Sequence, residues 1–169
     1  MGTGVASSTT KKVVIRRFDR EPLQGFVNPQ TFLQPEGVEL LSPVGTVATI
    51  PYIQIKTVSF VRDFDAADSG PDRKVFATRP KMNGLWVRMQ LKDGEQLDGI
   101  LSNDLLLISP WGFNVVPPDS SANNQKLFIP RTALLKVDVL GVVGSTLTKP
   151  KRGTAKESDA QIGLFEEPA

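Results

Sequence analysis

The chain carries few of the side chains on which enzyme chemistry usually depends. It has no histidine and no cysteine, which excludes imidazole-based acid–base or triad chemistry, disulfides, and metal sites built from thiolate or imidazole. Carboxylates, hydroxyls, lysines and Tyr52 remain. Ser102 and Ser109 have no lysine at the Ser-x-x-Lys spacing, and the sequence has no glycine-rich phosphate loop. We therefore expect no enzymatic activity, no catalytic residues and no cofactor.

A run of acidic residues invites a comparison with calcium loops. Asp63, Asp65 and Asp68 lie within the sequence DFDAADSG. The third carboxylate comes one residue later than in the Asp-x-Asp-x-Asp-Gly loop that binds Ca²⁺. Solvated acids at the end of a strand explain the run better, and the sequence predicts no metal site.

The basic residues give one candidate for nucleic-acid binding. Arg16, Arg17 and Arg20 form the densest basic cluster, together with two preceding lysines. The ordinary alternative is an exposed face of an edge strand, where charges also oppose aggregation. Over the whole chain 20 basic residues stand against 18 acidic ones, so bulk charge does not indicate nucleic-acid binding.

An aromatic group gives the second candidate. Trp111 and Phe113, with Arg131 further along, offer a stacking platform for a nucleic-acid base. Aromatic residues that cover the mouth of a barrel, or fill a seam between two barrels, explain the same pattern.

A short apolar motif stands in an otherwise polar C-terminal segment. Its residues are Gln161, Ile162, Gly163, Leu164 and Phe165. The motif resembles the bacterial sliding-clamp-binding peptide, which implies that Leu164 and Phe165 fill a pocket on a partner protein while Gln161 bonds at its rim. The alternative is that the two apolar side chains pack on the chain's own domain.

The elements that would position these residues are strands, and the clearest are in 86–101. Val87, Met89 and Leu91 alternate with polar residues, which predicts a strand with one buried face. A two-residue turn at Asp93-Gly94 would mix the faces. We predict instead a three-residue loop over 92–94 with Gly94 in the left-handed conformation, which places Met89 opposite Leu97 and Val87 opposite Gly99.

The pattern of the second half repeats that of the first. Leu23-x-Gly25 matches Leu97-x-Gly99, a Gly-led strand at 37–40 matches one at 112–115, and Ile50-Pro51 matches Ile129-Pro130, each in the same order. The spacing between the copies grows only where turns fall. We read a tandem repeat, in which each unit of about five short strands is marginal alone and buries its edges against the other unit or further copies.

The expected organisation follows from this repeat. It is a flexible arm over 1–11, a first barrel over 12–65, a linker over 66–83 in which Val75 and Phe76 dock on a barrel, a second barrel over 84–144, and a disordered tail over 145–169. No apolar run approaches a transmembrane length and the N-terminus lacks a signal-peptide apolar region. We expect a cytoplasmic protein with no membrane contact.

The second unit, with its V-x-M-x-L-K-D-G-x-x-L-x-G hairpin and its Ile-Pro ending, resembles the Sm-like barrel. In the first unit, Val58-Ser59-Phe60-Val61-Arg62-Asp63-Phe64 is similar to the end of an uncharacterised bacterial domain found beside signalling modules. These resemblances imply an all-β chain of two tandem small five-stranded Sm-like barrels with short loops, the kind of fold that assembles into rings. RNA-binding Sm proteins pair an Asp/Asn-rich loop with a later Arg-Gly or Lys-His element. Here Asn103-Asp104 stands in the first position, but Arg131-Thr132 stands where the second element would be, so the sequence departs from the RNA-binding pattern.

The function expected from the sequence is a non-enzymatic interaction or scaffolding module of bacterial regulatory type. It would be a homo-oligomer that self-assembles through barrel edges, with a further protein partner at the tail motif. The alternative is a nucleic-acid-associated protein, acting through an Sm-like surface or through sliding-clamp recruitment.

Overall fold

Alternating apolar residues and closely spaced turns give the first half of the chain a series of short strands. Val13 and Ile15, two residues apart, are both fully buried, as expected of a strand with one face in a core. The elements of the first half are β1 (Lys11–Arg17), β2 (Leu23–Val27), β3 (Leu33–Gln34), β4 (Gly37–Leu41), β5 (Val47–Ile50), the 3-10 turn η1 (Tyr52–Gln54), β6 (Ile55–Val61) and the 3-10 turn η2 (Asp65–Asp68).

The second half has the same kinds of element in longer form. They are β7 (Gly84–Leu91), β8 (Gln96–Leu101), the 3-10 turn η3 (Leu105–Leu107), β9 (Gly112–Val116), β10 (Asn124–Pro130), the 3-10 turn η4 (Arg131–Ala133) and β11 (Leu134–Val143). The computed structural model describes residues 9–68, 73–121 and 123–144. Within these ranges the chain forms no α-helix, so the expected all-β class is confirmed.

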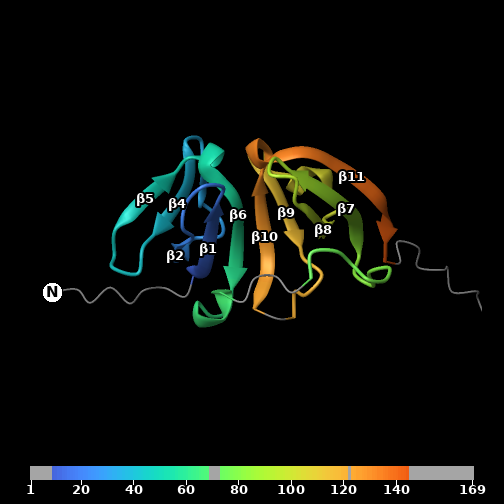
Figure 1. Cartoon of the computed structure of the whole chain (residues 1–169), viewed down its shortest axis with the longest axis horizontal. Helices are drawn as coiled ribbons and strands as arrows, with labels where there is room; N and C mark the ends of the chain where they lie inside the picture. Colours follow the sequence, from blue (N-terminus) through green and yellow to red (C-terminus); the bar gives the residue numbers. More distant parts are fainter. Residues whose placement is uncertain (1–8, 69–72, 122, 145–169) are drawn as a thin grey trace, which may run out of the picture.

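All eleven strands belong to one antiparallel sheet. Its order is β11-β7-β8-β9-β10-β6-β1-β2-β4-β3, with β5 on the other side of β4. The expectation of two separate five-stranded barrels is not confirmed, because β6 and β10 pair across the middle and join both halves into a sheet that does not close (Figure 1). This pairing satisfies the backbone hydrogen-bonding groups along the facing edges of β6 and β10. The same groups would be exposed if the two halves were separate.

The two halves repeat one strand order. In each half the last strand lies beside the first: β6 pairs with β1, and β11 pairs with β7. The first hairpins match in register, since Val13 lies opposite Gly25 and Val87 opposite Gly99. In both halves a proline then leads into a 3-10 turn and the last strand, at Pro51 and at Pro130.

The β7–β8 hairpin has the register expected from its alternation. Met89 lies opposite Leu97, and the loop closes where the Leu91 N–H donates to the Glu95 carbonyl at 2.8 Å. Gly94 adopts φ 88°, the left-handed conformation that glycine takes without steric cost. The prediction of a three-residue loop is confirmed. Gly99 permits a close approach, because a Cβ there would stand 2.8 Å from the Cβ of Val115 on β9.

Each half has its own apolar core, and the two cores meet at β10. Val13, Ile15, Val58 and Phe60 belong to the first core. The buried residues of the second core are Val87, Met89, Leu91, Leu97, Leu101, Val115, Leu127, Ile129 and Ala133. Because side chains alternate along β10, Leu127 and Ile129 enter the second core while Phe128 between them enters the first. Among the described residues no helix is long and apolar enough to cross a membrane.

Candidate functional site: the seam and the free edges

The two halves are joined along the pairing of β6 with β10, which we call the seam. Val58 lies opposite Phe128, Ser59 opposite Leu127, and Phe60 opposite Lys126. Val58 and Phe128 are fully buried, and Ser59 is 2% exposed. The seam therefore buries side chains as completely as the interior of either half.

Phe128 is the side chain that fixes the second half onto the first. Its ring lies edge-on to Phe32, with centroids 5.7 Å apart, and 6.5 Å from the centroid of Tyr52. Phe32 in turn lies edge-on to Phe60 on β6. Edge-to-face packing of this kind adds to the free energy of apolar burial, so a residue of the second half completes the core of the first.

Tyr52 and Trp111 form a second contact between the halves. Their rings are stacked, with centroids 5.5 Å apart and planes at 10°. The Tyr52 hydroxyl donates to the Gln34 carbonyl at 2.5 Å, and the Tyr52 carbonyl accepts from the Thr132 hydroxyl at 3.0 Å. Burial and the nearby negative charge of Glu36 raise the pKa of Tyr52 to about 12. The phenol therefore stays neutral and serves as a hydrogen-bond donor.

An ion-pair cluster connects the start of β6 with the β7–β8 loop. Lys56 contacts the carboxylates of Asp93 and Glu95, and Lys74 lies 2.6 Å from Glu95. Burial opposes the charge on Glu95, but hydrogen bonds from Lys56 and Lys74 outweigh it and lower its pKa. The hydrogen bond from Lys56 likewise lowers the pKa of Asp93. The cluster thus stays ionised and ties the two halves together.

A groove of about 560 Å³ runs beside this cluster. Arg16 and Gln24 of the first half line it, together with Thr57, Ser59 and residues of the second half that include Leu127. The Asn124 Oδ1 atom, also in this region, is buried and has no hydrogen-bond partner. The ionised side chains that line the groove include Lys56, Lys74 and Glu95, which already pair with one another.

Asp98 forms a buried polar site that the sequence pattern does not reveal. It is 1% exposed, and Arg88 donates to both of its carboxylate oxygens at 2.7 and 3.0 Å. The indole N–H of Trp86 and the backbone N–H of Phe76 donate to it as well, each at 3.3 Å. Burial would raise the pKa of Asp98, but these hydrogen bonds, led by the one from Arg88, hold it below the usual range. Strand alternation predicts that Asp98 lies on the polar face of β8 with Gln96, which is exposed, whereas the segment that contains Phe76 covers Asp98.

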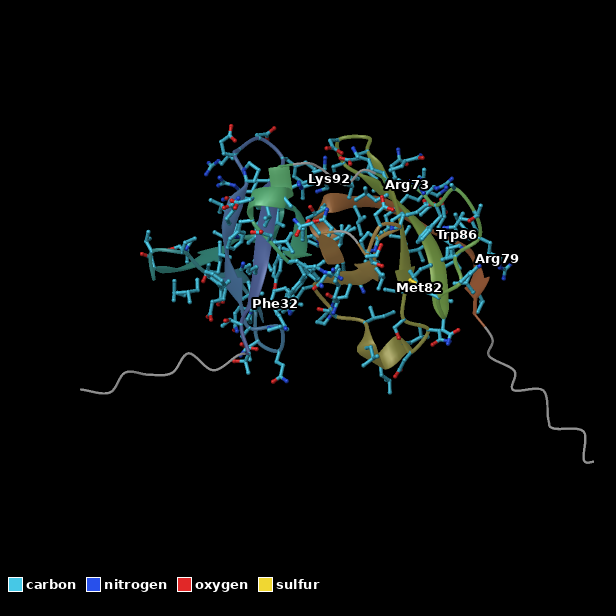
Figure 2. All side chains as sticks on the ribbon, turned by 90° about the horizontal axis from the view of Figure 1, so that it is seen from below. Phe32, Arg73, Arg79, Met82, Trp86 and Lys92 are labelled. Atoms are coloured by element: carbon cyan, nitrogen blue, oxygen red, sulfur yellow. The ribbon has the colours of Figure 1, made fainter. Side chains whose placement is uncertain are left out.

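That covering segment is the connection between the halves. Phe76 packs edge-on to Trp86 with ring centroids 6.1 Å apart, so its expected docking is confirmed, whereas Val75 remains 44% exposed. Figure 2 shows Arg73, Arg79 and Met82 of this segment on the side of the second half that carries Trp86. Within residues 73–83 the connection contacts β7 and β8 through Phe76 and the Lys74 carbonyl, whereas most of its other residues are exposed.

Besides the two-residue β3, which pairs only with β4 among the described residues, the sheet has two free edges, β5 and β11. In the part of the chain that the structure describes, β5 pairs only with β4 and β11 only with β7, and the two strands lie at opposite ends of the long axis (Figure 1). Val47 on β5 is 61% exposed, and Val139 on β11 is 62% exposed. An exposed apolar edge strand presents unpaired backbone groups to any strand that can add to it.

The predicted nucleic-acid residues do not form one patch. Arg16 lines the 560 Å³ groove, whereas Arg17 and Arg20 line a different pocket of about 440 Å³ with Lys92. The Arg17 guanidinium also donates twice to the Glu21 carbonyl, at 2.7 and 3.1 Å, so it shapes the β1–β2 turn. The cluster that is continuous in sequence is divided between two surfaces.

The aromatic candidates are divided as well. Arg131 lies over the ring of Phe113, 5.0 Å from its centroid, and both line a shallow pocket beside β11. Trp111 instead packs against Tyr52 at the seam. It therefore fills a contact between the two halves, which is the alternative explanation of this aromatic group. The tail motif residues Gln161, Ile162, Leu164 and Phe165 lie outside the described residues.

The acidic run that follows β6 has a structural partner. The Asn123 side chain accepts from the Asp63 N–H at 2.8 Å and donates to the Asp63 carbonyl at 2.8 Å. Asp65–Asp68 then form η2. Within residues 9–68, 73–121 and 123–144 no group of three acidic residues is placed to hold a metal ion.

Comparison with known proteins gives a family without an assigned activity. The model of a family of unknown function, DUF6982, matches residues 9–141, which include every strand except the last two residues of β11. No curated protein and no solved structure matches the chain significantly.

Proposed function

We propose that this chain, which belongs to the DUF6982 family of unknown function, is a non-enzymatic interaction module that associates with itself through the free edges of its sheet. The observation that carries the proposal is the set of exposed apolar side chains on the two end strands. Val47–Ile50 contains no charged residue, and β11 exposes Val139 and Leu140. An edge strand with exposed apolar side chains can accept another strand, although β11 also carries Lys136, Asp138 and two bulges, which oppose such pairing.

The two halves are best interpreted as Sm-like units. The placement of the last strand beside the first supports this, as does the shared bend glycine in the first hairpin, at Gly25 and Gly99. The similarity of the Val58–Phe64 segment to a bacterial domain found beside signalling modules supports a scaffolding role of bacterial regulatory type, in the cytoplasm. The tail motif, Gln161 to Phe165, is proposed as the site of a further protein partner.

Light scattering on the purified chain tests self-association. A monomer has a mass of 18.4 kDa, and we expect the measured mass to rise above this value as protein concentration increases. The Val139→Lys variant replaces an exposed side chain and should remain folded, yet it should shift the rise to higher concentration because a charged edge opposes pairing. A mass of one chain at all concentrations would exclude the proposal.

Nucleic-acid binding is the second candidate, and one observation favours it. Arg17, Arg20 and Lys92 line one pocket with Phe18, against the single acid Asp19. Positive groups of this kind suit a phosphate backbone, whereas the Phe18 side chain packs against the second core.

Binding of labelled single-stranded RNA at several salt concentrations tests this candidate. Arg20→Ala and Lys92→Ala should weaken binding and reduce its salt dependence, whereas Arg16→Ala, in the other groove, is the control for net charge. Absence of binding at low salt would exclude it.

A further inference from the structure

The seam shows how one half of this chain pairs with the other. Within the chain, β10 pairs with β6. β10 is the fourth strand of the second half, and β6 is the last strand of the first half. The corresponding strands of the opposite halves are β5, which precedes Pro51 as β10 precedes Pro130, and β11, which follows η4 as β6 follows η1. Both of these strands are free edges of the sheet.

We infer that copies of the chain join head to tail, with β5 of one copy pairing antiparallel with β11 of the next in the register of the seam. This inference rests on the proposed function, since it names the partner of the free edges and its alignment. Aligning Ile50-Pro51 with Ile129-Pro130, and Ile55 with Leu134, transfers the register without adjustment. At the seam, Phe60 lies opposite Lys126. At the joint between copies, the corresponding residues are Val139 of one copy and Val47 of the other, which lie opposite each other.

Burial at corresponding positions supports the transfer. Val58 and Phe60 on β6 are 0% and 7% exposed. The corresponding residues of β11 are Val137, which is half-buried, and Val139, which is exposed. On β10, Leu127 and Phe128 are buried, whereas the corresponding Ala48 and Thr49 on β5 are exposed. Corresponding side chains are therefore buried on β6 and β10, in the middle of the sheet, and more exposed on β5 and β11, at its ends.

A loop next to the second core shows the same difference. The loop between β2 and β4 carries Phe32, which is 4% exposed because Phe60 and Phe128 cover it. The corresponding loop of the second half contains η3, whose Leu105, Leu106 and Leu107 are all at least 67% exposed. A strand added to β11 approaches this side of the second half, as β10 approaches Phe32.

The polarity of the joint follows from the face on which the side chains lie. On β5, Ala48 and Ile50 lie opposite Leu40 and Val38 of the first core. Val47 and Thr49, the alternate residues, therefore point away from that core, as Phe128 points away from the second core. They are the residues that would contact Val137 and Val139 of the next copy. Such a joint is heterologous, so copies extend into a ring or an open chain.

The joint between copies should be weaker than the seam. Phe128, which fills the first core at the seam, corresponds to Thr49 on β5. The pairing is also short, because the Arg79 guanidinium donates to the Val142 carbonyl at 2.7 Å and occupies the end of β11. At the corresponding place on β6, the Asn123 side chain ends the seam at Asp63. We therefore expect reversible association between chains whose halves stay joined.

Disulfide trapping tests the register, because the chain has no cysteine of its own. Opposed residues of an antiparallel pair have Cα atoms at the separation that a disulfide requires. Under mild oxidation the V47C/V139C double variant should form a ladder of covalent multimers. The V44C/V139C variant is the matched control, since Val44 lies at the exposed turn before β5, and it should cross-link about tenfold more slowly because its thiols lie farther apart. Mixing the single variants V47C and V139C should give the mixed dimer.

Three outcomes separate this inference from the proposed function. Dimers of V139C alone, or of V47C alone, that form as readily as the mixed dimer would overturn the head-to-tail joint while leaving self-association intact. Equal cross-linking of the control pair would overturn the register. A mass of one chain by light scattering, with no covalent ladder, would overturn the inference and the proposed function together.

Discussion

The Asp98 carboxylate is held by donors from two parts of the chain. Arg88 and Trp86 belong to β7, and the backbone N–H of Phe76 belongs to the segment between the halves. A buried carboxylate is stable only when such donors replace its hydration. Asp98 therefore couples the packing of the connecting segment to the second half.

Replacing this carboxylate should destabilise the fold. We expect Asp98→Asn to lower the free energy of unfolding by about 2–4 kcal/mol, because Arg88 loses its charged partner while the site stays buried. Urea unfolding followed by tryptophan fluorescence measures the change, since Trp86 contacts the site. Asp138→Asn is the matched control: its ion pair with Lys136 is exposed, so its effect should stay within about 0.5 kcal/mol. Equal effects of the two substitutions would contradict the role assigned to Asp98.

The same group should make stability depend on pH in the acid range. The pKa of Asp98 is lower in the folded chain than in the unfolded one, so its contribution is complete above the unfolded value of about 4 and is lost as pH falls through the folded value. Thermal unfolding between pH 7 and pH 2 should show this loss. The slope should be smaller in Asp98→Asn, and part of it should remain because the pKa values of Asp93 and Glu95 are also lowered. An unchanged slope in the variant would contradict the assignment.

Residues of this kind mark the limit of prediction from the sequence. Alternation along β8 assigns Asp98 to the polar face together with Gln96, and Gln96 is indeed exposed. Burial of Asp98 depends on a segment that precedes it by more than twenty positions and has no regular pattern. Strand periodicity carries no information about such a cover.

At the scale of elements, β10 belongs to both cores. Phe128 contributes its ring to the first half, while its neighbours on the strand contribute to the second. The β7–β8 hairpin could be predicted because its register depends on nearby residues and one glycine. The seam could not, because β6 and β10 are far apart in the sequence and the pattern of each fits equally well a strand that pairs only within its own half. The seam position of Trp111 likewise depends on Tyr52, a distant partner.

Truncation of Phe128 tests whether the halves depend on each other. Phe128→Ala should lower the free energy of unfolding by about 3–5 kcal/mol, the range for a fully buried aromatic residue. Because this residue fills the first core from the second half, calorimetry should also show the single transition broaden or divide. Thr49→Ala, at the corresponding and exposed position of β5, should change stability by less than about 0.5 kcal/mol. A loss of stability confined to the second half would contradict the shared role of β10.

At the scale of the whole molecule, one sheet joins two similar units and leaves complementary strands at its ends. A charge exchange tests this complementarity. In the head-to-tail register, residue 47 of one copy faces residue 139 of the next, so V47E/V139K places opposite charges together and V47K/V139K places like charges together. We expect the first variant to associate about fivefold more tightly than the second, in line with cross-strand pair energies. Sedimentation velocity at low salt measures the difference, and equal association would contradict the pairing.

Hydrogen exchange at low and high protein concentration tests the central claim most directly. If copies associate through their free edges, backbone amides in 47–50 and 137–140 should exchange more slowly at high concentration, because pairing protects them from solvent. Amides of β7 and β8, which lie inside the sheet, should exchange at the same rate at both concentrations. Exchange in the two edge strands that does not change while the mass of the particle increases would contradict the account.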